Sequence, residues 1–393
     1  MENVIILQYK IIVEYTMWFI LRPDATNVWK NKTVCKRYSR CKGILDGNRI
    51  PRYLITKKIG IETSLDEPLN VLWKAHEQAA KEFKKLIKNI DSGKITIDEL
   101  PFPKKSFLDL KEKIAHEMLK ECHFCERRCK TNRAQNEAGF CRLGKESYIS
   151  SAFAHTGEES VLVPSGTIFF TGCTFTCVFC QNSDISQEWY STPQQRITEG
   201  IKVSPKQVAL MAEKLWKEGV RNINLVGGDP TPNLHTIISM LKKFDKNITI
   251  LWNSNMYQSL EATKLLLEIM DFWLPDFKFW ENSFAKRMSG VNNYREIISR
   301  NIKLAYSKGS GEILIRHLIM PGRVGKDTIP ILNWCAVEVP KALINLMDQY
   351  RPEYLVKRRG NNYSSINKRI STSEWEKATS IADDLGLLWK PVS

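Results

Sequence analysis

The chain has 393 residues, a formal net charge of +15 and hydrophobic residues at 43% of its positions. This length suits one barrel-sized domain with additional segments, and the apolar content is enough for a large buried core. No stretch approaches the ~18 uninterrupted apolar residues of a membrane helix, and the opening 21 residues lack the basic start and cleavage site of a signal peptide, so we expect a cytoplasmic protein without membrane contact.

Residues 1–75 are predicted to be a basic extension, to which the pattern assigns no fold. Residues 29–58 alone hold ten Lys or Arg and a single acid, Asp46. Such a segment can dock on RNA or on an acidic protein, but a solvated face or a mobile arm is the more usual structure for it. A second basic run, 357–369, falls in a predicted C-terminal tail, 353–393.

Residues 76–150 are predicted to be a helical segment that carries a metal site. Apolar residues at helical spacing predict one helix over 73–90, and a second is expected over 106–120 with Ser106 as its cap. The second helix leads into a C-x2-C-x3-C-x11-C pattern formed by Cys122, Cys125, Cys129 and Cys141. Four thiolates can close a tetrahedral zinc site or hold an iron–sulfur cluster, and the spacing leaves both open.

Residues 151–352 alternate between short apolar runs and helical stretches. This alternation predicts an α/β fold of parallel strands with covering helices, in which functional residues gather at the carboxyl ends of the strands. The pattern alone leaves open a doubly wound sheet or a barrel. The expected strands are 167–171, 222–226, 248–252, 272–275, 313–319 and 343–347, and the expected helices are 205–218, 234–244, 259–270, 294–307 and 326–337.

A second group of cysteines, Cys173, Cys177 and Cys180, follows the first of these strands on a loop. Three thiolates within eight residues can hold one face of a cubane cluster, whereas a structural zinc site normally has four ligands. The next Cys or His in the sequence is His235. The pattern therefore predicts a [4Fe-4S] cluster with one iron open to another ligand.

Polar residues follow the next four predicted strands. Gly227 and Gly228 would let the backbone approach a ligand, and Asp229 can meet a positive amino group. The further candidates also have structural alternatives, namely a helix cap for the two asparagines and a buried ion pair for the Asp and Lys. His317 lies next to Arg316 and would point to the opposite face, so we expect a structural histidine there. The candidates are Asn253, Asn255, Asp276, Lys278 and Arg316.

The C-x3-C-x2-C spacing, with Phe179 before the last cysteine, resembles the signature of the radical S-adenosylmethionine (SAM) superfamily. The resemblance implies a partial (β/α)6 barrel, a [4Fe-4S] cluster and SAM, whose reductive cleavage gives a radical that abstracts hydrogen. By the same resemblance, 227–229 would meet the methionyl amine, although Asp stands where Glu is more common. Asn253 and Asn255 would meet the ribose and carboxylate, Lys278 would contact SAM, Asp276 would help bind a cation and Arg316 would pair with the SAM carboxylate.

A finer resemblance rests on the cysteine pattern of 122–141 with its interspersed arginines, on 227–232 (GGDPTP), on 316–322 (RHLIMPG) and on 347–352 (MDQYRP). Together they are similar to the pyruvate formate-lyase activating enzyme-like proteins of the PflX type, over about 121–352. This implies an oxidoreductase, a ferredoxin- or flavodoxin-like electron donor and a protein substrate that becomes a glycyl radical. Known activases place auxiliary clusters after the SAM loop, whereas the first set here precedes it. Radical modification of RNA, a peptide or a small molecule, and a non-enzymatic iron–sulfur or zinc scaffold, remain alternatives.

Overall fold

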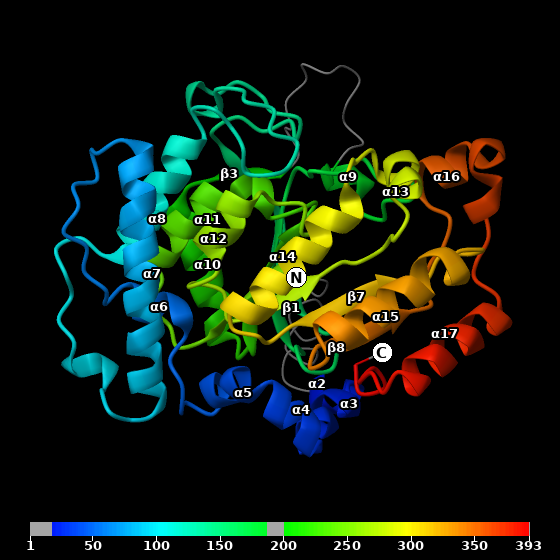
Figure 1. Ribbon diagram of the computed structural model, residues 1–393, viewed down its shortest axis with the longest axis horizontal. Helices are drawn as coiled ribbons and strands as arrows, with labels where there is room; N and C mark the ends of the chain where they lie inside the picture. The colour runs from blue at the N-terminus through cyan, green and yellow to red at the C-terminus, as the bar shows by residue number, and fades with distance from the viewer. Residues whose placement is uncertain (1–17, 187–199, 393) are drawn as a thin grey trace, which may run out of the picture.

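A computed structural model describes residues 18–186 and 200–392 of the chain, arranged around one central sheet (Figure 1). The parallel strands of the core lie side by side in the order of the sequence. Two parallel bridges, Trp273–Ile313 and Asp276–Arg316, join β6 to β7 and so link the two parts of the sheet. The core strands are β2 (Ser165–Phe170), β4 (Asn222–Gly227), β5 (Thr249–Ser254), β6 (Phe272–Pro275), β7 (Leu314–Leu318) and β8 (Leu343–Met347). All six were expected, and their order is that of a partial (β/α)6 barrel.

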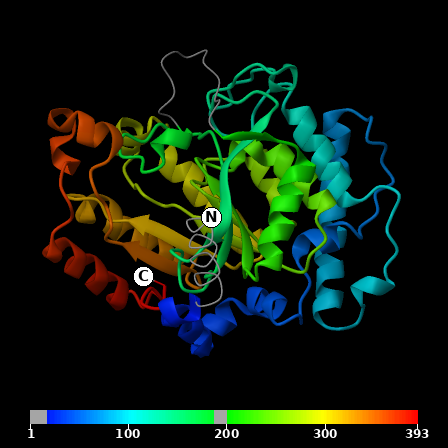
Figure 2. The same cartoon turned by 180° about the vertical axis from the view of Figure 1, so that it is seen from behind.

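Two further strands lie at the outer edge and were not expected. β1 (Ser147–His155) runs antiparallel to β2, and the short β3 (Ile201–Val203) runs antiparallel to β1. β1 crosses the face turned to the viewer in Figure 2. It covers the edge of β2 that would otherwise stay unpaired at the start of the barrel.

The helices that follow the core strands cover the outer face of the sheet. α10 begins at a cap predicted from the sequence, because the Ser204 hydroxyl accepts from Gln207 N at 3.3 Å and Pro205 takes the first helical position. α12 ends four residues earlier than expected, and α13 was not expected. The helices are α10 (Pro205–Lys217), α11 (Leu234–Lys243), α12 (Leu260–Leu266), α13 (Asn282–Ser289), α14 (Tyr294–Lys308) and α15 (Ile329–Glu338).

The two helices predicted before the first cysteine set are present as α7 (Leu69–Asp91) and α8 (Phe107–Met118). Ser106 and Asp109 form a reciprocal capping box at the start of α8. α8 packs between α7 and α11, and its apolar face, which includes Leu110 and Ile114, is fully buried. The helical segment before the first cysteine set, called the preface below, is therefore part of the main core.

The basic N-terminal extension is folded where the structure describes it. The short helices α2 (Trp18–Leu21), α3 (Pro23–Asn27), α4 (Lys32–Arg37) and α5 (Ser39–Leu45) lie below the sheet in Figure 1, and α6 (Arg52–Thr56) lies beside α7. Tyr38 is buried and donates its hydroxyl to Ile313 O at 3.0 Å, and Glu312 accepts from Arg40 N and Cys41 N at 2.5 and 2.9 Å. The expectation of a mobile arm is thus wrong for 29–58, because these contacts tie it to the amino ends of the strands. Residues 1–17 lie outside the described part.

The C-terminal segment also belongs to the domain. α17 (Thr372–Asp384) packs on α15, and α16 (Tyr354–Arg358) follows β8. After α17 the chain returns to the sheet, where Ile344 N on β8 donates to Leu388 O at 3.0 Å. Among the described residues, no helix combines the length and apolar character needed to cross a membrane.

Two buried glutamates connect four strands inside the sheet. Glu158 accepts from Asn224 on β4 at 3.1 Å, and Glu159 accepts from Asn345 on β8 at 2.8 Å. Both pair with Arg316 on β7, whose Nε lies 2.6 Å from Glu159 Oε1. Arg316 also donates to Asn253 on β5 at 3.3 Å. This ion network joins β4 and β5 to β7 and β8 across the interior.

Candidate functional site

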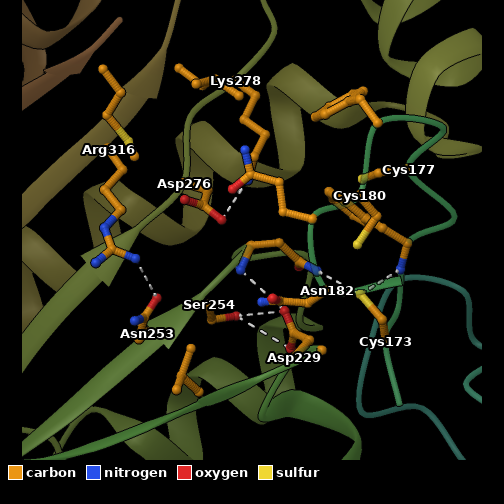
Figure 3. A pocket seen from close by; sticks show the side chains of 18 of the residues that line it. Cys173, Cys177, Cys180, Asn182, Asp229, Asn253, Ser254, Asp276, Lys278 and Arg316 are labelled. Atoms are coloured by element: carbon orange, nitrogen blue, oxygen red, sulfur yellow. Dashed lines mark hydrogen bonds and ion pairs between the residues drawn. The ribbon is translucent and has the colours of Figure 1, made fainter. Parts of the chain in front are cut away.

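A cavity of about 1100 Å³, including its open mouth, lies at the carboxyl edge of the core strands. The loop after β2 forms one side of it, and the ends of β4 to β8 form the rest (Figure 3). The structure brings the predicted site residues of 173–316 together there. The lining contains Cys173, Cys177, Phe179, Cys180, Gly227, Gly228, Asp229, Asn253, Asn255, Asp276, Lys278 and Arg316.

The three cysteines of the loop border this cavity. The unexpected helix α13 braces the loop, because Thr176 N donates to Ser289 O at 3.0 Å and Cys177 Sγ lies 3.0 Å from Ser289 Oγ. Cys180 Sγ lies 3.3 Å from Ser186 Oγ, and Phe175 N donates to Cys173 Sγ at 3.3 Å. Of these contacts the Phe175 N–H is a donor to sulfur, whereas Ser186 donates its own proton to Asn182 O at 2.7 Å. Backbone N–H donors to sulfur are typical of thiolates that hold an iron–sulfur cluster.

The arrangement of the sulfurs also bears on the metal that they can hold. Within residues 18–186 and 200–392, no three Cys, His, Asp or Glu side chains converge as ligands of one ion would. In a four-iron cluster each thiolate binds a different iron, so the ligands stay further apart than around a single ion. The lining holds no fourth Cys and no His among the described residues, which fits a cluster with one open iron.

Phe179 supports the loop from within the core. Its ring contacts those of Phe279 and Tyr350, each with centroids 6.1 Å away in edge-on geometry. Its side chain is buried, although it reaches the lining of the cavity. Tyr350 belongs to the segment after β8, so this contact fixes the loop to the last strand.

The glycine pair at the end of β4 serves packing as well as access. Gly227 has φ +128°, and a Cβ there would lie 1.9 Å from Phe170 O. A Cβ at Gly228 would lie 2.4 Å from Gly172 O. The prediction attributed these glycines to a ligand, whereas in the structure the end of β2 already excludes a side chain at position 227 and the loop after β2 excludes one at position 228.

The Asp229 carboxylate connects the ends of β4 and β5 through hydrogen bonds. Its carboxylate accepts from Thr231 N at 2.8 Å, from the Ser254 hydroxyl at 3.1 Å and from Asn255 N at 3.1 Å. Burial raises the pKa of Asp229, and these three donors oppose that rise. No described basic side chain forms a salt bridge with it, so a cationic ligand group would meet an uncompensated carboxylate there.

Asn253 and Asn255 differ in which of their hydrogen-bond groups a ligand in the cavity could bind. Asn255 donates to Thr174 Oγ1 at 2.9 Å and to Cys173 Sγ at 3.8 Å, so it contacts the cysteine loop. Asn253 accepts from Arg316, but its own Nδ2 is buried without a partner in the structure. A buried donor without an acceptor is costly, which fits a ligand acceptor at this point of the cavity.

Asp276 and Lys278 form the ion pair that was the structural alternative for them. Lys278 Nζ lies 2.5 Å from Asp276 Oδ2, and both side chains remain partly accessible in the cavity (Figure 3). The Lys278 backbone is fixed by Tyr294, whose hydroxyl accepts from Lys278 N at 2.8 Å. Their predicted roles toward SAM and a cation stay predictions.

Arg316 differs from the expectation of a free fork for the SAM carboxylate. Nε and Nη2 are bound by Glu159 and Glu158, and Nη1 donates to Asn253. Burial works to raise the pKa of Glu158, but Arg316 and His155 outweigh it and lower the value to about 2. A two-pronged contact with a ligand would require a glutamate to move, which leaves Nη1 for the predicted role. His317 is structural, as expected, with Nδ1 2.7 Å from Phe277 O.

Sequence reasoning missed part of the lining. Gln181 and Asn182 follow the last cysteine, and Leu318 lies on β7. Gln349 and Arg351 border the mouth within the segment 347–352, whose motif was noted without assigning its residues to the site. Glu158 and Glu159 carried no signal, since a carboxylate pair next to a strand gains meaning only when the fold brings Arg316 to it.

The first cysteine set lies beside this site, in the loops above the sheet in Figure 1. Its four members, Cys122, Cys125, Cys129 and Cys141, line one small separate pocket. Thr174, from the loop of the second set, lines the same pocket. All four cysteines thus border one pocket, although no three described side chains converge there as ligands of a single ion would, and their role as metal ligands stays a prediction.

The profile of the radical SAM superfamily matches residues 167–335, which hold the cysteine loop and the strand ends β4 to β7. The match covers this segment of the chain and neither the N-terminal helical segment nor the residues after 335. Over most of its length the chain is also similar to the uncharacterized protein MJ0674 of Methanocaldococcus jannaschii, with 43% identity over 336 residues, covering 86% of this chain and 94% of that protein. The two belong to one family.

Solved structures show a more distant likeness. A domain of pyruvate-formate lyase-activating enzyme from Bacteroides vulgatus is 17% identical, covers 43% of this chain and 96% of its own, and has a TM-score of 0.35. SuiB of Streptococcus suis bound to S-adenosylmethionine is 12% identical, covers 54% of this chain and 44% of its own, and has a TM-score of 0.38.

Proposed function

We propose that the chain is a radical SAM enzyme in which Cys173, Cys177 and Cys180 hold a [4Fe-4S] cluster whose open iron faces the cavity. The observation that carries this is the described lining, in which these three thiols meet no fourth Cys or His. When bound, the cluster and SAM supply reductive cleavage of the sulfonium and a radical that abstracts hydrogen from a substrate.

The chain's own residues would hold the SAM molecule around this loop. Asp229 presents an uncompensated buried carboxylate to a cationic group, and Asn253 Nδ2 offers a free donor to an acceptor. Lys278 contributes a cation that can leave Asp276 for an anionic group. These side chains come from three successive strands, so one ligand can contact all of them in the cavity.

The test is anaerobic. Protein reconstituted with iron and sulfide is reduced with dithionite in the presence of SAM, and 5′-deoxyadenosine is measured for the wild type and for Cys177→Ala. We expect formation by the wild type and loss of it in the variant. Cys35→Ser is the matched control, since this thiol lies outside both sets and contacts Trp29 O. Equal formation by Cys177→Ala would overturn the proposal.

For the substrate, we propose a glycine of a partner protein, as in glycyl-radical activases, with a ferredoxin- or flavodoxin-like donor. The motif around Asp276 and Lys278 and the segment 347–352, which borders the mouth, support it. Incubation with the glycyl-radical proteins of the same genome, SAM and reductant should give a doublet in electron paramagnetic resonance. A product in RNA, in a peptide or in a small molecule, with no doublet, would replace this substrate class and leave the SAM chemistry intact.

A further inference from the structure

The first cysteine set forms a pocket that the SAM site does not use. Its four thiols are free, and Cys122 and Cys141 are buried. The segment 121–144 that carries them contains one short helical turn, η3 (Arg133–Gln135), and otherwise irregular chain. Phe124 and Leu143 are buried within it, and backbone hydrogen bonds such as that from Cys122 N to Thr131 O at 3.0 Å hold part of its conformation. Arg133 and Thr174 line the pocket together with the four cysteines.

Arg133 gives this pocket its electrostatic character. The side chain is completely buried, with Nε donating to Gly144 O at 2.9 Å and Nη2 donating to Pro232 O at 2.8 Å. Nη1 points to Cys122 Sγ at 3.7 Å. In the described part of the chain, no carboxylate forms an ion pair with this guanidinium. A buried cation without an anion is strongly unfavourable, and the lining groups that can become anionic are the thiols.

The backbone leaves room for the sulfurs. A Cβ at Gly139 would lie 3.3 Å from Cys129 Sγ, so a side chain there would press on this sulfur. The glycine is held in place by its own N–H, which donates to Leu143 O at 3.0 Å. The loop thus keeps open the space around Cys129.

We propose that Cys122, Cys125, Cys129 and Cys141 bind a metal centre of their own as four thiolates, with Arg133 as its buried counter-cation. A zinc ion and a [4Fe-4S] cluster both take four thiolates and leave net negative charge on the site. Among the described residues no three of these thiols converge as ligands of a single ion would, which favours the cluster, in which each thiolate binds a different iron. The centre would use none of the cysteines in the loop of 173–180, so each centre can be removed by its own substitutions.

The proposed centre lies against the SAM site through Thr174. The Thr174 side chain lines the four-cysteine pocket, and its hydroxyl accepts from Asn255 Nδ2 at 2.9 Å. Its carbonyl accepts from Arg127 Nε at 2.9 Å, and Arg127 lies two residues after Cys125. Loss of metal from the first set is therefore expected to disturb the loop of the second.

The decisive measurement is the metal content of Cys177→Ala, in the full-length chain, after anaerobic loading with iron and sulfide or with zinc. We expect this variant to keep one centre, as about four iron atoms with a reduced-cluster resonance signal or as about one zinc. The two loading arms distinguish the metals. A folded Cys177→Ala protein that retains neither would overturn the proposal, whatever the outcome for SAM cleavage. Cys125→Ser should lose this centre, and Cys35→Ser should lose nothing.

Arg133→Met offers a second test that does not depend on removing a ligand. In the metal-free wild type Arg133 is a buried cation without an anion, and the variant removes it, so the metal-free variant should melt at a higher temperature than the metal-free wild type. In the metal-loaded protein the variant removes the counter-cation of the centre. The loaded variant should therefore melt at a lower temperature than the loaded wild type and release metal faster to a chelator. The two shifts have opposite signs. A melting temperature that falls equally in both forms would show a purely packing role and overturn the assignment of Arg133.

Discussion

Arg127 Nε donates to Thr174 O at 2.9 Å and thereby joins the two cysteine-bearing loops. The guanidinium lies 3.8 Å from the centre of the Phe140 ring, on the side of the first set. Its Nη2 is buried and has no hydrogen-bond partner in the structure. One half-buried arginine therefore carries the contact between a loop of the preface and a loop of the barrel.

Arg127→Met should weaken this contact while keeping the volume of the side chain. We expect the free energy of unfolding to fall by about 1–3 kcal/mol, since a charged hydrogen bond and a cation–π contact are lost. Urea unfolding of the loaded protein measures it. Arg128→Met is the control, because Arg128 is exposed and its pairs with Glu126 and Glu261 should contribute less than about 1 kcal/mol. Equal losses in the two variants would contradict the role of Arg127.

Gly227→Ala should prevent the strands β2 and β4 from packing. The new Cβ would lie 1.9 Å from Phe170 O, so the backbone must move, and we expect little folded protein. Gly219→Ala is the matched control: Gly219 also has a positive φ, +82°, but nothing lies within 4 Å of the added Cβ. That change should cost about 1–2 kcal/mol from backbone strain alone. Thermal melts compare the two, and similar melting temperatures would contradict the packing argument.

Asp229→Asn should weaken the binding of SAM. The amide keeps the shape of the carboxylate but removes the charge. It has one accepting oxygen instead of two, so it cannot accept both from Thr231 N, which binds Oδ1, and from the Ser254 hydroxyl and Asn255 N, which bind Oδ2. We expect a loss of stability of about 1–3 kcal/mol and at least a tenfold weaker SAM affinity by calorimetry of the reconstituted protein. Asp184→Asn, at an exposed position beside the cavity loop, should change neither. Unchanged SAM affinity in Asp229→Asn would remove Asp229 from the ligand site.

Glu312 should make stability depend on pH. Burial raises its pKa to about 7 from an ordinary 4.5, against the opposing hydrogen bonds from Cys41 and Arg40. Between these values the folded chain binds more protons than the unfolded chain, so stability falls as pH rises, by up to about 3 kcal/mol. Urea unfolding at pH 5 and pH 8 measures this difference. It should shrink in Glu312→Gln and persist in Glu67→Gln, an exposed control. If Glu312→Gln kept the whole difference in unfolding free energy between pH 5 and pH 8, that difference would belong to other titrating groups.

The core strands could be predicted because each is an apolar run between turn residues, and β6 and β8 begin and end as expected. β1 escaped prediction because Ser147–His155 mixes small, polar and half-exposed residues, and only pairing with β2 makes it a strand. The N-terminal helices escaped because they are short, and their contacts join residues distant in the chain, such as Tyr38 and Ile313.

In the site, too, contacts between residues distant in the chain could not be predicted from the sequence. The residues of the cavity were predictable from motifs at strand ends, because parallel strands bring those ends together. The partners of these residues were not. Gly227 faces the end of β2, and Gly228 faces the loop after it. Arg316 faces two glutamates. These contacts depend on chain segments more than fifty residues away. Motifs thus predicted which side chains line the cavity. Long-range packing determines which of their donors and acceptors remain able to bind a ligand.

The glutamates at 158 and 159 have a mechanical consequence. Because Arg316, Asn224 and Asn345 all converge on them, the first and last parts of the sheet are tied together near its axis. Separating these strands would leave the guanidinium of Arg316 and the two carboxylates without partners in an apolar interior, which costs free energy. The barrel wall should therefore stay rigid during turnover, and entry of a large substrate must come from movement of the rim loops alone.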